Sequence, residues 1–275
     1  MELTIHAHGA AIPARGFGTW RLTGEACVAA VAAALDCGYR HIDTARVYDN
    51  EREVGAALAA SGLARDAVFV TTKVWFEDLA AGALERSAEG SLKRLGLSAV
   101  DLLLVHWPNP AIALKETIGA LCRTRESGLA RHIGVSNFPV PLLEEAVAHA
   151  RAPLVCNQCE YHPWLDQSAV IAACARHGMA FTAYSPLGKG DLVQAAPIRA
   201  IAERIGRTPA QVVLRWHLQQ GVVAIPRSGT RAHIAENFRI DDFALSDADM
   251  AAIFALRRPD GRLVDPGWAP RWDRS

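Results

Sequence analysis

The feature that most constrains the fold of this chain is a repeated alternation of short β-rich runs with longer stretches of helical spacing. Strands in such chains pair in parallel, because each helix returns the chain to the start of the next strand. The sequence therefore predicts an α/β fold. The expected strands are Ala14–Gly18, Arg40–Asp43, Val68–Val74, Val100–His106, His132–Val135, Leu154–Asn157, Ala180–Tyr184 and Val222–Ile225.

Helix start and stop signals lie between these runs. Thr208 followed by Pro209 is typical of an N-cap with proline at the first helical position. Ser246 and Asp249 have the spacing of a capping box before a further helix. The remaining expected helices each end before a glycine, a common C-terminal signal, and are Ala26–Cys37, Ala80–Leu95 and Gln167–His177.

Two architectures satisfy this pattern, an open doubly wound sheet and a closed barrel. The number and shortness of the strands favour a (β/α)8 TIM barrel, with an N-terminal extension before it. We expect residues 1–275 to form a single domain, since no linker or low-complexity stretch divides them. The segment after Leu256 is rich in Arg, Pro, Gly and Trp, which predicts a short irregular tail over the active-site end.

Composition excludes several classes of partner. Lys and Arg total 29, as do Asp and Glu, so no general attraction to nucleic acid or to an acidic membrane is expected. The start of the chain lacks a secretory signal pattern, and no apolar run is long enough to span a bilayer. Six scattered cysteines indicate reduced thiols, and we expect a cytoplasmic protein.

One pair of cysteines, Cys156 and Cys159, has the CxxC spacing of redox and metal sites. Residues three apart on an extended strand point to opposite faces. No second CxxC completes a structural zinc site. We therefore interpret both as buried thiols, and the sequence predicts no metal site.

Ionisable side chains lie at or just after the ends of three strands that are otherwise of the buried type. They are Asp43, followed by Tyr48, then Lys73 and His106. Catalytic groups of a barrel lie at the C-terminal strand ends, and buried charges are expected to pair. Lys73 would lower the phenol pKa of Tyr48 from its reference of ~10, so that Tyr48 could donate a proton to a carbonyl oxygen.

Around these residues the chain resembles the aldo-keto reductase family. The segment from Gly38 to Gly55, which contains His-Ile-Asp-Thr-Ala-Arg-Val-Tyr, is similar to the main signature of that family. Gly-Phe-Gly-Thr-Trp before it, Thr-Thr-Lys-Val-Trp and Leu-Leu-Val-His-Trp-Pro also match in context. The matching landmarks continue to Glu236 and Asn237, so the resemblance spans nearly the whole chain.

The resemblance implies that Asp43, Tyr48, Lys73 and His106 are the catalytic tetrad of an NADPH-dependent enzyme that reduces a small-molecule carbonyl to an alcohol. It implies no catalytic metal. Tyr48 would be the general acid, and a hydride would pass directly from the nicotinamide. The implied cofactor-binding residues are Thr19, Trp20, Ser136, Asn137, Gln158, Tyr184, Ser185, Leu187, Arg227, Ser228, Thr230, His233, Glu236 and Asn237.

One departure from the family concerns the residues that bind the 2′-phosphate of NADPH. The family more often has Lys at position 227 and Arg at 233, where this chain has Arg227 and His233. Arg227 can bind phosphate through two hydrogen bonds, but a histidine with a pKa near ~6.5 is mostly neutral at pH 7. We therefore expect NADPH to be preferred by a reduced margin and NADH to be accepted as well.

By the same resemblance, Trp20, Trp75 and Trp107 line the substrate pocket with Tyr48 and His106, and Trp268 closes over it. Short loops and a short tail place the chain near the bacterial branch of 2,5-diketo-D-gluconate reductases. A non-enzymatic cofactor-binding or regulatory protein on the same fold is the alternative, which the complete tetrad disfavours. A closed barrel hides its strand edges, so a monomer is expected.

Overall fold

The structure is a computed structural model that describes residues 3–273. Eight parallel strands form one sheet in the spatial order β10-β9-β8-β7-β6-β5-β4-β3, so each strand pairs with its sequence neighbours. The strands are β3 (Phe17–Gly18), β4 (His41–Asp43), β5 (Phe69–Val74), β6 (Val100–Val105), β7 (Ala130–Ser136), β8 (Leu154–Glu160), β9 (Ala180–Tyr184) and β10 (Val223–Ala224).

The two ends of this sheet meet and close the barrel. Arg15 and Ala224 form a parallel bridge, and Gly18 donates a backbone hydrogen bond of 3.0 Å to the carbonyl of Pro226. Glycines are required at this seam, because a Cβ on Gly16 would lie 2.5 Å from Ile225 and one on Gly18 would lie 2.9 Å from the Ile225 carbonyl. The predicted (β/α)8 architecture is thus confirmed.

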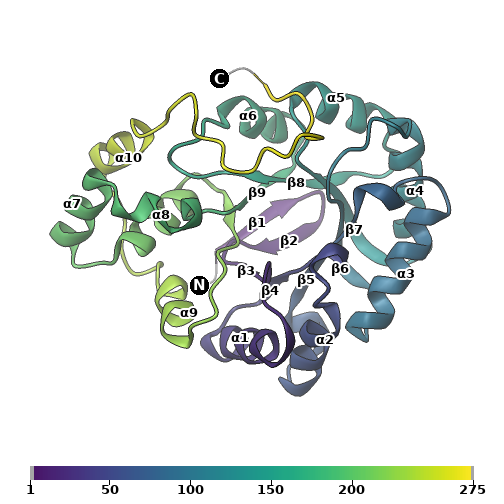
Figure 1. The fold of residues 1–275 in the computed structure, drawn as a ribbon, viewed down its shortest axis with the longest axis horizontal. Helices are drawn as coiled ribbons and strands as arrows, with labels where there is room; N and C mark the ends of the chain where they lie inside the picture. Colours follow the sequence, from purple (N-terminus) through teal and green to yellow (C-terminus); the bar gives the residue numbers. More distant parts are fainter. Residues whose placement is uncertain (1–2, 274–275) are drawn as a thin grey trace.

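Helices surround the ring of strands (Figure 1). They are α1 (Gly24–Cys37), α2 (Glu51–Ala60), α3 (Ala83–Leu95), α4 (Leu114–Glu126), α5 (Val140–His149), α6 (Ser168–Arg176), α7 (Ala196–Ile205), α8 (Pro209–Gln219), α9 (Arg231–Phe238) and α10 (Asp247–Phe254). The predicted caps are present, since Thr208 accepts a hydrogen bond from the Gln211 N–H and Ser246 accepts one from the Asp249 N–H.

The apolar run Leu102–Val105 in β6 follows from its position between two packed layers. Leu102 and Leu104 belong to the cluster inside the barrel, whereas Leu103 and Val105 pack outward against the helices. Alternate residues of a strand face opposite sides, so a run buried on both faces is apolar at every position. The same alternation places Cys156 in the inner cluster and Cys159 in the outer one, on opposite faces as predicted.

The N-terminal extension is an antiparallel hairpin of β1 (Thr4–Ala7) and β2 (Ala10–Pro13). Ala10 and Ile12 are fully buried against the inner cluster, and His8 contacts the carbonyl of His177 in the loop that precedes β9. The hairpin therefore covers the N-terminal end of the barrel, and it fills the centre of the ring in Figure 1.

The C-terminal segment after α10 has no helix or strand up to residue 273 and runs beside β8, α6 and α5 (yellow in Figure 1). Its contacts with residues that follow β5, β6 and β7 place it at the C-terminal end of the barrel, as predicted. Within residues 3–273, no helix is long and apolar enough to cross a membrane.

Candidate active site

The structure brings together Asp43, Tyr48, Lys73 and His106. Asp43 is the last residue of β4, Lys73 lies one residue before the end of β5, and His106 directly follows β6. Since β4, β5 and β6 are adjacent and parallel, their carboxyl ends meet at one edge. Tyr48 ends the short helix η1 (Arg46–Tyr48) that follows β4, which returns its ring to the same edge.

Lys73 is the centre of the cluster. Its side chain is fully buried, and its Nζ donates hydrogen bonds to Asp43 Oδ1 at 2.5 Å and to the Thr44 carbonyl at 2.9 Å. The same Nζ lies 3.4 Å from the hydroxyl of Tyr48. A buried ammonium is costly unless it is paired, and here the carboxylate of Asp43 stabilises it. The second oxygen of Asp43 accepts a hydrogen bond of 2.8 Å from Gln158.

The pKa of Tyr48 shows a balance that the sequence did not predict. Burial raises this pKa, the positive charge of Lys73 lowers it, and the net direction is upward from 10.0. The expectation that Lys73 would leave the pKa below its ordinary value is therefore wrong for the protein without ligands, because desolvation of the phenolate outweighs the ammonium. Tyr48 is held as a neutral phenol, which is the form that donates a proton.

His106 is a neutral imidazole. Burial, and to a lesser extent Lys73, holds its pKa well below 6.5. Its ring packs edge-on against Tyr48 at 5.6 Å and against Trp75 at 5.3 Å between ring centroids. Its Nδ1 is buried and has no hydrogen-bond partner within the described part of the chain. Because unpartnered buried donors are rarer than unpartnered acceptors, we assign the proton to Nε2, where it can be donated to a substrate oxygen.

A chain of amide and hydroxyl groups adjoins the tetrad at the ends of β7, β8 and β9. Asn137 donates to the His106 carbonyl at 3.0 Å and accepts from the Tyr184 hydroxyl at 2.8 Å. Ser136 donates to the Gln158 carbonyl at 2.7 Å. Asn137 has a φ of 65°, a left-handed conformation that turns the chain sharply out of β7. Four of the predicted cofactor residues, Ser136, Asn137, Gln158 and Tyr184, thus form one contiguous wall.

Two further predicted cofactor residues follow β9. Ser185 is left-handed at φ 50°, and Leu187 is half-buried against the core. At the opposite side of the tetrad, Thr19 donates its hydroxyl to the Asp43 carbonyl at 3.0 Å and is fully buried. Trp20, next to it, is 49% exposed and lies over Tyr48 at 4.8 Å between ring centroids.

The residues predicted for the 2′-phosphate and adenine gather on α9 and the loop before it. Arg227, Thr230 and His233 are exposed, and Asn237 is buried. Thr230 is the N-cap of α9 and makes no side-chain capping bond, so the first N–H groups of the helix keep their capacity to bind an anion. Ser228 accepts a hydrogen bond of 3.0 Å from the Thr230 N–H, and Glu236 accepts one of 2.6 Å from Thr208.

Aromatic rings form the wall above the tetrad. Trp268 of the C-terminal segment packs against Trp75 at 5.7 Å and Trp107 at 5.1 Å between centroids, and it stacks on Phe76 at 4.8 Å. The predicted pocket tryptophans are therefore assembled from three loops and the tail. Phe76 was missed, because an aromatic residue just after a strand is more often ordinary packing.

Asn50 was also missed, although it lies inside the recognised signature. It is fully buried; its amide donates to the carbonyls of Thr19 at 2.8 Å and Leu22 at 2.9 Å, and its Oδ1 accepts from Thr44. These bonds tie the loop after β3 to the loop that carries Tyr48. A buried amide so close to Tyr48 could have been noted from the sequence as a loop anchor.

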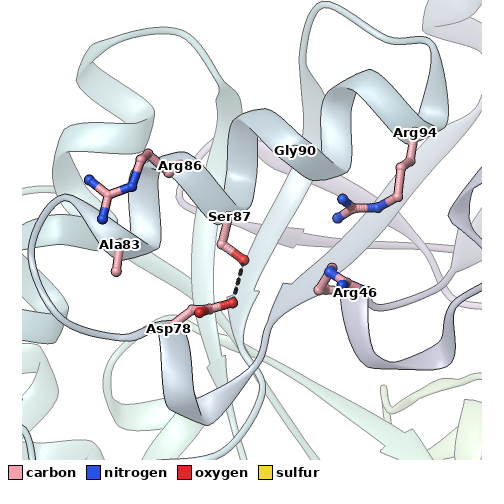
Figure 2. Close-up of a pocket in the computed structure, with 7 residues that line it drawn as sticks. All are labelled: Arg46, Asp78, Ala83, Arg86, Ser87, Gly90 and Arg94. Atoms are coloured by element: carbon pink, nitrogen blue, oxygen red, sulfur yellow. Dashed lines mark hydrogen bonds between the residues drawn. The ribbon is translucent and has the colours of Figure 1, made fainter.

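A separate hollow of about 230 Å³ lies on the outer side of the barrel, lined in part by Arg46, Asp78, Ser87 and Arg94 (Figure 2). Asp78 accepts a hydrogen bond from Ser87 in it, and the guanidinium of Arg94 is already paired with the buried Glu51. None of the tetrad lines this hollow. It is distinct from the candidate active site.

The cysteine thiols do not contribute to the candidate chemistry. All six cysteines are free, and burial raises the pKa of both Cys156 and Cys159 to about 12, so neither is a reactive thiolate. Within residues 3–273, no group of three or more His, Cys, Asp or Glu side chains is placed to hold a metal ion.

Comparison with known proteins identifies the family. Residues 16–258 match the model of the Aldo/keto reductase family. Methylglyoxal reductase DkgB of Escherichia coli O157:H7 is 42% identical over 267 residues, which cover 96% of this chain and 100% of that protein. An aldo-keto reductase of Mycolicibacterium smegmatis is 43% identical, with 94% of each chain covered. The chain belongs to the aldo/keto reductase family.

Solved structures agree. A crystal structure named for 2,5-diketo-D-gluconic acid reductase B is 45% identical in sequence and has a TM-score of 0.97. The match covers 99% of this chain and 98% of that one. A Bombyx mori aldo-keto reductase in complex with NADP has a TM-score of 0.90 at 32% identity, with 98% and 99% covered. The expected family, fold and enzyme class, an NADPH-dependent oxidoreductase, are confirmed.

Proposed function

We propose that this protein reduces the carbonyl group of small aldehydes and ketones, with Tyr48 as the general acid and Asp43, Lys73 and His106 as its partners. The observation that carries the proposal is the placement of the Tyr48 hydroxyl 3.4 Å from a buried ammonium and beside a neutral imidazole. This arrangement keeps a proton on the phenol and offers a positive charge to the phenolate that remains after the proton leaves.

The donor set fits a nicotinamide cofactor with a 2′-phosphate. The amides of Asn137 and Gln158 with the hydroxyl of Ser136 would bind the carboxamide, and the ring of Tyr184 would stack on the nicotinamide. The uncapped N-terminus of α9, with Arg227, would bind the phosphate. Ser185 and Leu187 would border the pyrophosphate, and Glu236 and Asn237 the adenine.

When bound, the reduced nicotinamide supplies a hydride to the carbonyl carbon. Before this transfer, His106 would donate a hydrogen bond from Nε2 to the carbonyl oxygen and so orient the carbonyl group. Tyr48 gives its proton to the same oxygen as negative charge develops there. Lys73 stabilises the phenolate, and Asp43 holds Lys73 in place through the hydrogen bond of 2.5 Å. The reverse steps oxidise an alcohol, with the phenolate of Tyr48 as base.

Small α-dicarbonyls and keto-sugars are the substrates we infer. Relatives that cover nearly the whole chain are named methylglyoxal reductase and 2,5-diketo-D-gluconic acid reductase. Trp20 packs on Tyr48, Trp75 packs on His106, and Trp107 packs on Trp268. A small substrate enclosed by these rings would have its carbonyl group next to Tyr48 and His106. We further infer that residues 1–275 act as one domain, as a monomer in the cytoplasm.

Replacing Tyr48 by Phe tests this function, with Tyr39→Phe as a matched control. Tyr39 precedes the same strand, β4, and its buried hydroxyl donates to the Ile234 carbonyl of α9 at 3.4 Å rather than to a tetrad residue. NADPH oxidation is followed with methylglyoxal, 2,5-diketogluconate and an aromatic aldehyde. Loss of general acid catalysis should lower kcat about 10²- to 10⁴-fold in Tyr48→Phe. Tyr39→Phe should stay near wild type; equal activity of both variants rules out Tyr48 as the acid.

A protein that binds NADPH tightly but reduces nothing on this panel would instead favour the non-enzymatic role on the same fold. Cofactor binding is therefore measured separately, by quenching of protein fluorescence.

A further inference from the structure

The C-terminal tail, defined here as residues 257–273, has no helix or strand of its own yet holds Trp268 at a defined place in the pocket wall. A segment without a hydrogen-bonding ladder must satisfy its backbone groups elsewhere. The position of Trp268 therefore depends on the contacts that fix the chain before it. Near its start the tail is held by the Arg258 N–H, which donates to the Trp164 carbonyl at 3.0 Å, and closer to Trp268 two backbone N–H groups bind one buried carboxylate.

Glu160 is the last residue of β8 and is fully buried. Its Oε1 accepts a hydrogen bond of 2.8 Å from the backbone N–H of Leu263, and its Oε2 accepts one of 2.9 Å from the N–H of Val264. His162 Nε2 lies 3.0 Å from the same Oε1. A carboxylate that accepts from two successive backbone N–H groups makes strong, charge-assisted bonds and sets the direction of the chain that carries them.

Arg262 connects this anchor to the pocket wall. Its Nη1 lies 3.9 Å from Glu160 Oε2, and its guanidinium stacks on the ring of Trp272 at 3.7 Å. Trp272 in turn packs against Trp107 at 6.0 Å between centroids, and Trp107 packs against Trp268. Contacts thus run without a break from Glu160 to the aromatic wall above Tyr48.

The other side-chain contacts that hold the middle of the tail are more exposed. Lys189 donates to the Leu263 carbonyl, and Asp265 accepts from the indole of Trp272, both at 2.8 Å. Both bonds are at the surface, where water competes for the same groups. Glu160 is the buried contact, and its loss would leave the N–H groups of Leu263 and Val264 without their acceptor.

We propose that Glu160 is a positioning residue that sets substrate specificity by fixing the tail, and through it Trp268, over the active site. The proposal rests on the proposed carbonyl reduction. Glu160 touches none of the tetrad side chains in the contacts above, so its effect is on the binding of the carbonyl compound rather than on proton transfer. Bulky aromatic carbonyls, which reach the tail, depend on it more than methylglyoxal does.

The test is Glu160→Gln in the full-length protein, alone and combined with Trp268→Ala. The two backbone N–H groups bind different oxygens of Glu160, and glutamine replaces one of these oxygens by an NH2 group, so one N–H faces a donor instead of an acceptor. KM for an aromatic aldehyde should rise about tenfold, as expected for the loss of one hydrogen bond to a charged acceptor. The kcat, the KM for methylglyoxal and the affinity for NADPH should change less than about twofold, within the ordinary effect of a distant substitution.

If Glu160 acts through Trp268, Glu160→Gln should raise this KM no further in the Trp268→Ala background. Trypsin cleavage of the tail after Arg262 and Arg271 should also become faster, and this readout does not depend on enzyme turnover. A wild type that reduces no carbonyl would therefore refute the proposed function without affecting this second result. The matched control is Glu144→Gln, an exposed carboxylate paired with Arg176 and His177, which should change none of these quantities.

Unchanged tryptic cleavage, or the same rise in KM with and without Trp268, would overturn the proposal. Should Glu160→Gln fail to fold, Val264→Pro removes one of the two N–H donors from the tail side and leaves β8 intact. The same rise in KM and faster tryptic cleavage after Arg271 are expected from it, and their absence would equally refute the role of Glu160.

Discussion

The two ends of the barrel bury similar side chains in different ways. His41, at the start of β4, has both ring nitrogens bonded, Nδ1 to the Pro13 carbonyl at 3.2 Å and Nε2 to Thr71 at 3.0 Å. His106, at the other end, has a buried Nδ1 that finds no hydrogen-bond partner among residues 3–273. Burial lowers the pKa of both. The two histidines are thus similarly buried, but the hydrogen bonds of His41 are complete and those of His106 are not.

The carboxylates show the same contrast. Asp101, near the N-terminal end, accepts hydrogen bonds from Arg65, from Arg131 and from the backbone N–H of Val70, all at 2.9 Å or less. Asp43 holds a lysine that is itself 3.4 Å from a tyrosine hydroxyl. The first network ends in structural bonds, and the second ends in a group that can release a proton. A satisfied buried network stabilises the fold, whereas an incomplete one indicates chemistry.

The largest loss of activity is expected from Lys73→Met, at the C-terminal end of the barrel. Removing the ammonium leaves the Tyr48 phenolate without its stabilising charge, so kcat should fall about 10³-fold, within the range for the loss of electrostatic stabilisation. Steady-state kinetics measure this, with thermal unfolding to verify the fold. Lys93→Met, on the exposed side of α3, is the control and should leave kcat unchanged. A fall of less than tenfold would mean that the phenol needs no cation.

The two histidines should respond in opposite ways to glutamine. His106→Gln should lower kcat/KM about 10²-fold, because the donor to the carbonyl oxygen is misplaced, with little change in stability. His41→Gln should leave kcat unchanged and lower the free energy of unfolding by about 2 kcal/mol, since two buried hydrogen bonds are disturbed. Urea unfolding and kinetics on both variants check this. Equal effects on activity would contradict the contrast between the ends.

The smallest effect is expected at the 2′-phosphate site. His233 is exposed on the first turn of α9, where the family more often has arginine. His233→Arg should raise the preference for NADPH over NADH about fivefold, because one further surface cation near a phosphate contributes up to about 1 kcal/mol. The ratio of kcat/KM values for the two cofactors measures it. If the ratio does not rise, His233 is not the cause of a reduced preference.

Features that depend on residues close together in the sequence could be predicted, whereas features that depend on distant residues could not. The strand and helix pattern, the caps at Thr208 and Ser246 and the tetrad were all visible, because each rests on local spacing or on a contiguous motif. Glu160 was not, since the expected strand ended at Asn157 and its partners Leu263 and Val264 lie more than a hundred residues away. The direction in which the pKa of Tyr48 shifts could not be predicted either, because it depends on how deeply the folded protein buries the phenol.

The most direct test of the account is the pH dependence of kcat/KM in both directions. Burial raises the pKa of Tyr48 above 10.0, so the phenol is present at lower pH and is lost only as pH rises through this raised value. His106 has a pKa well below 6.5 and stays neutral at pH 7. Reduction should therefore be constant from about pH 6.5 to 9 and fall above about pH 10, while alcohol oxidation rises with pH. A fall in reduction centred between pH 6.5 and 8 would contradict the assignment of Tyr48 as the proton donor.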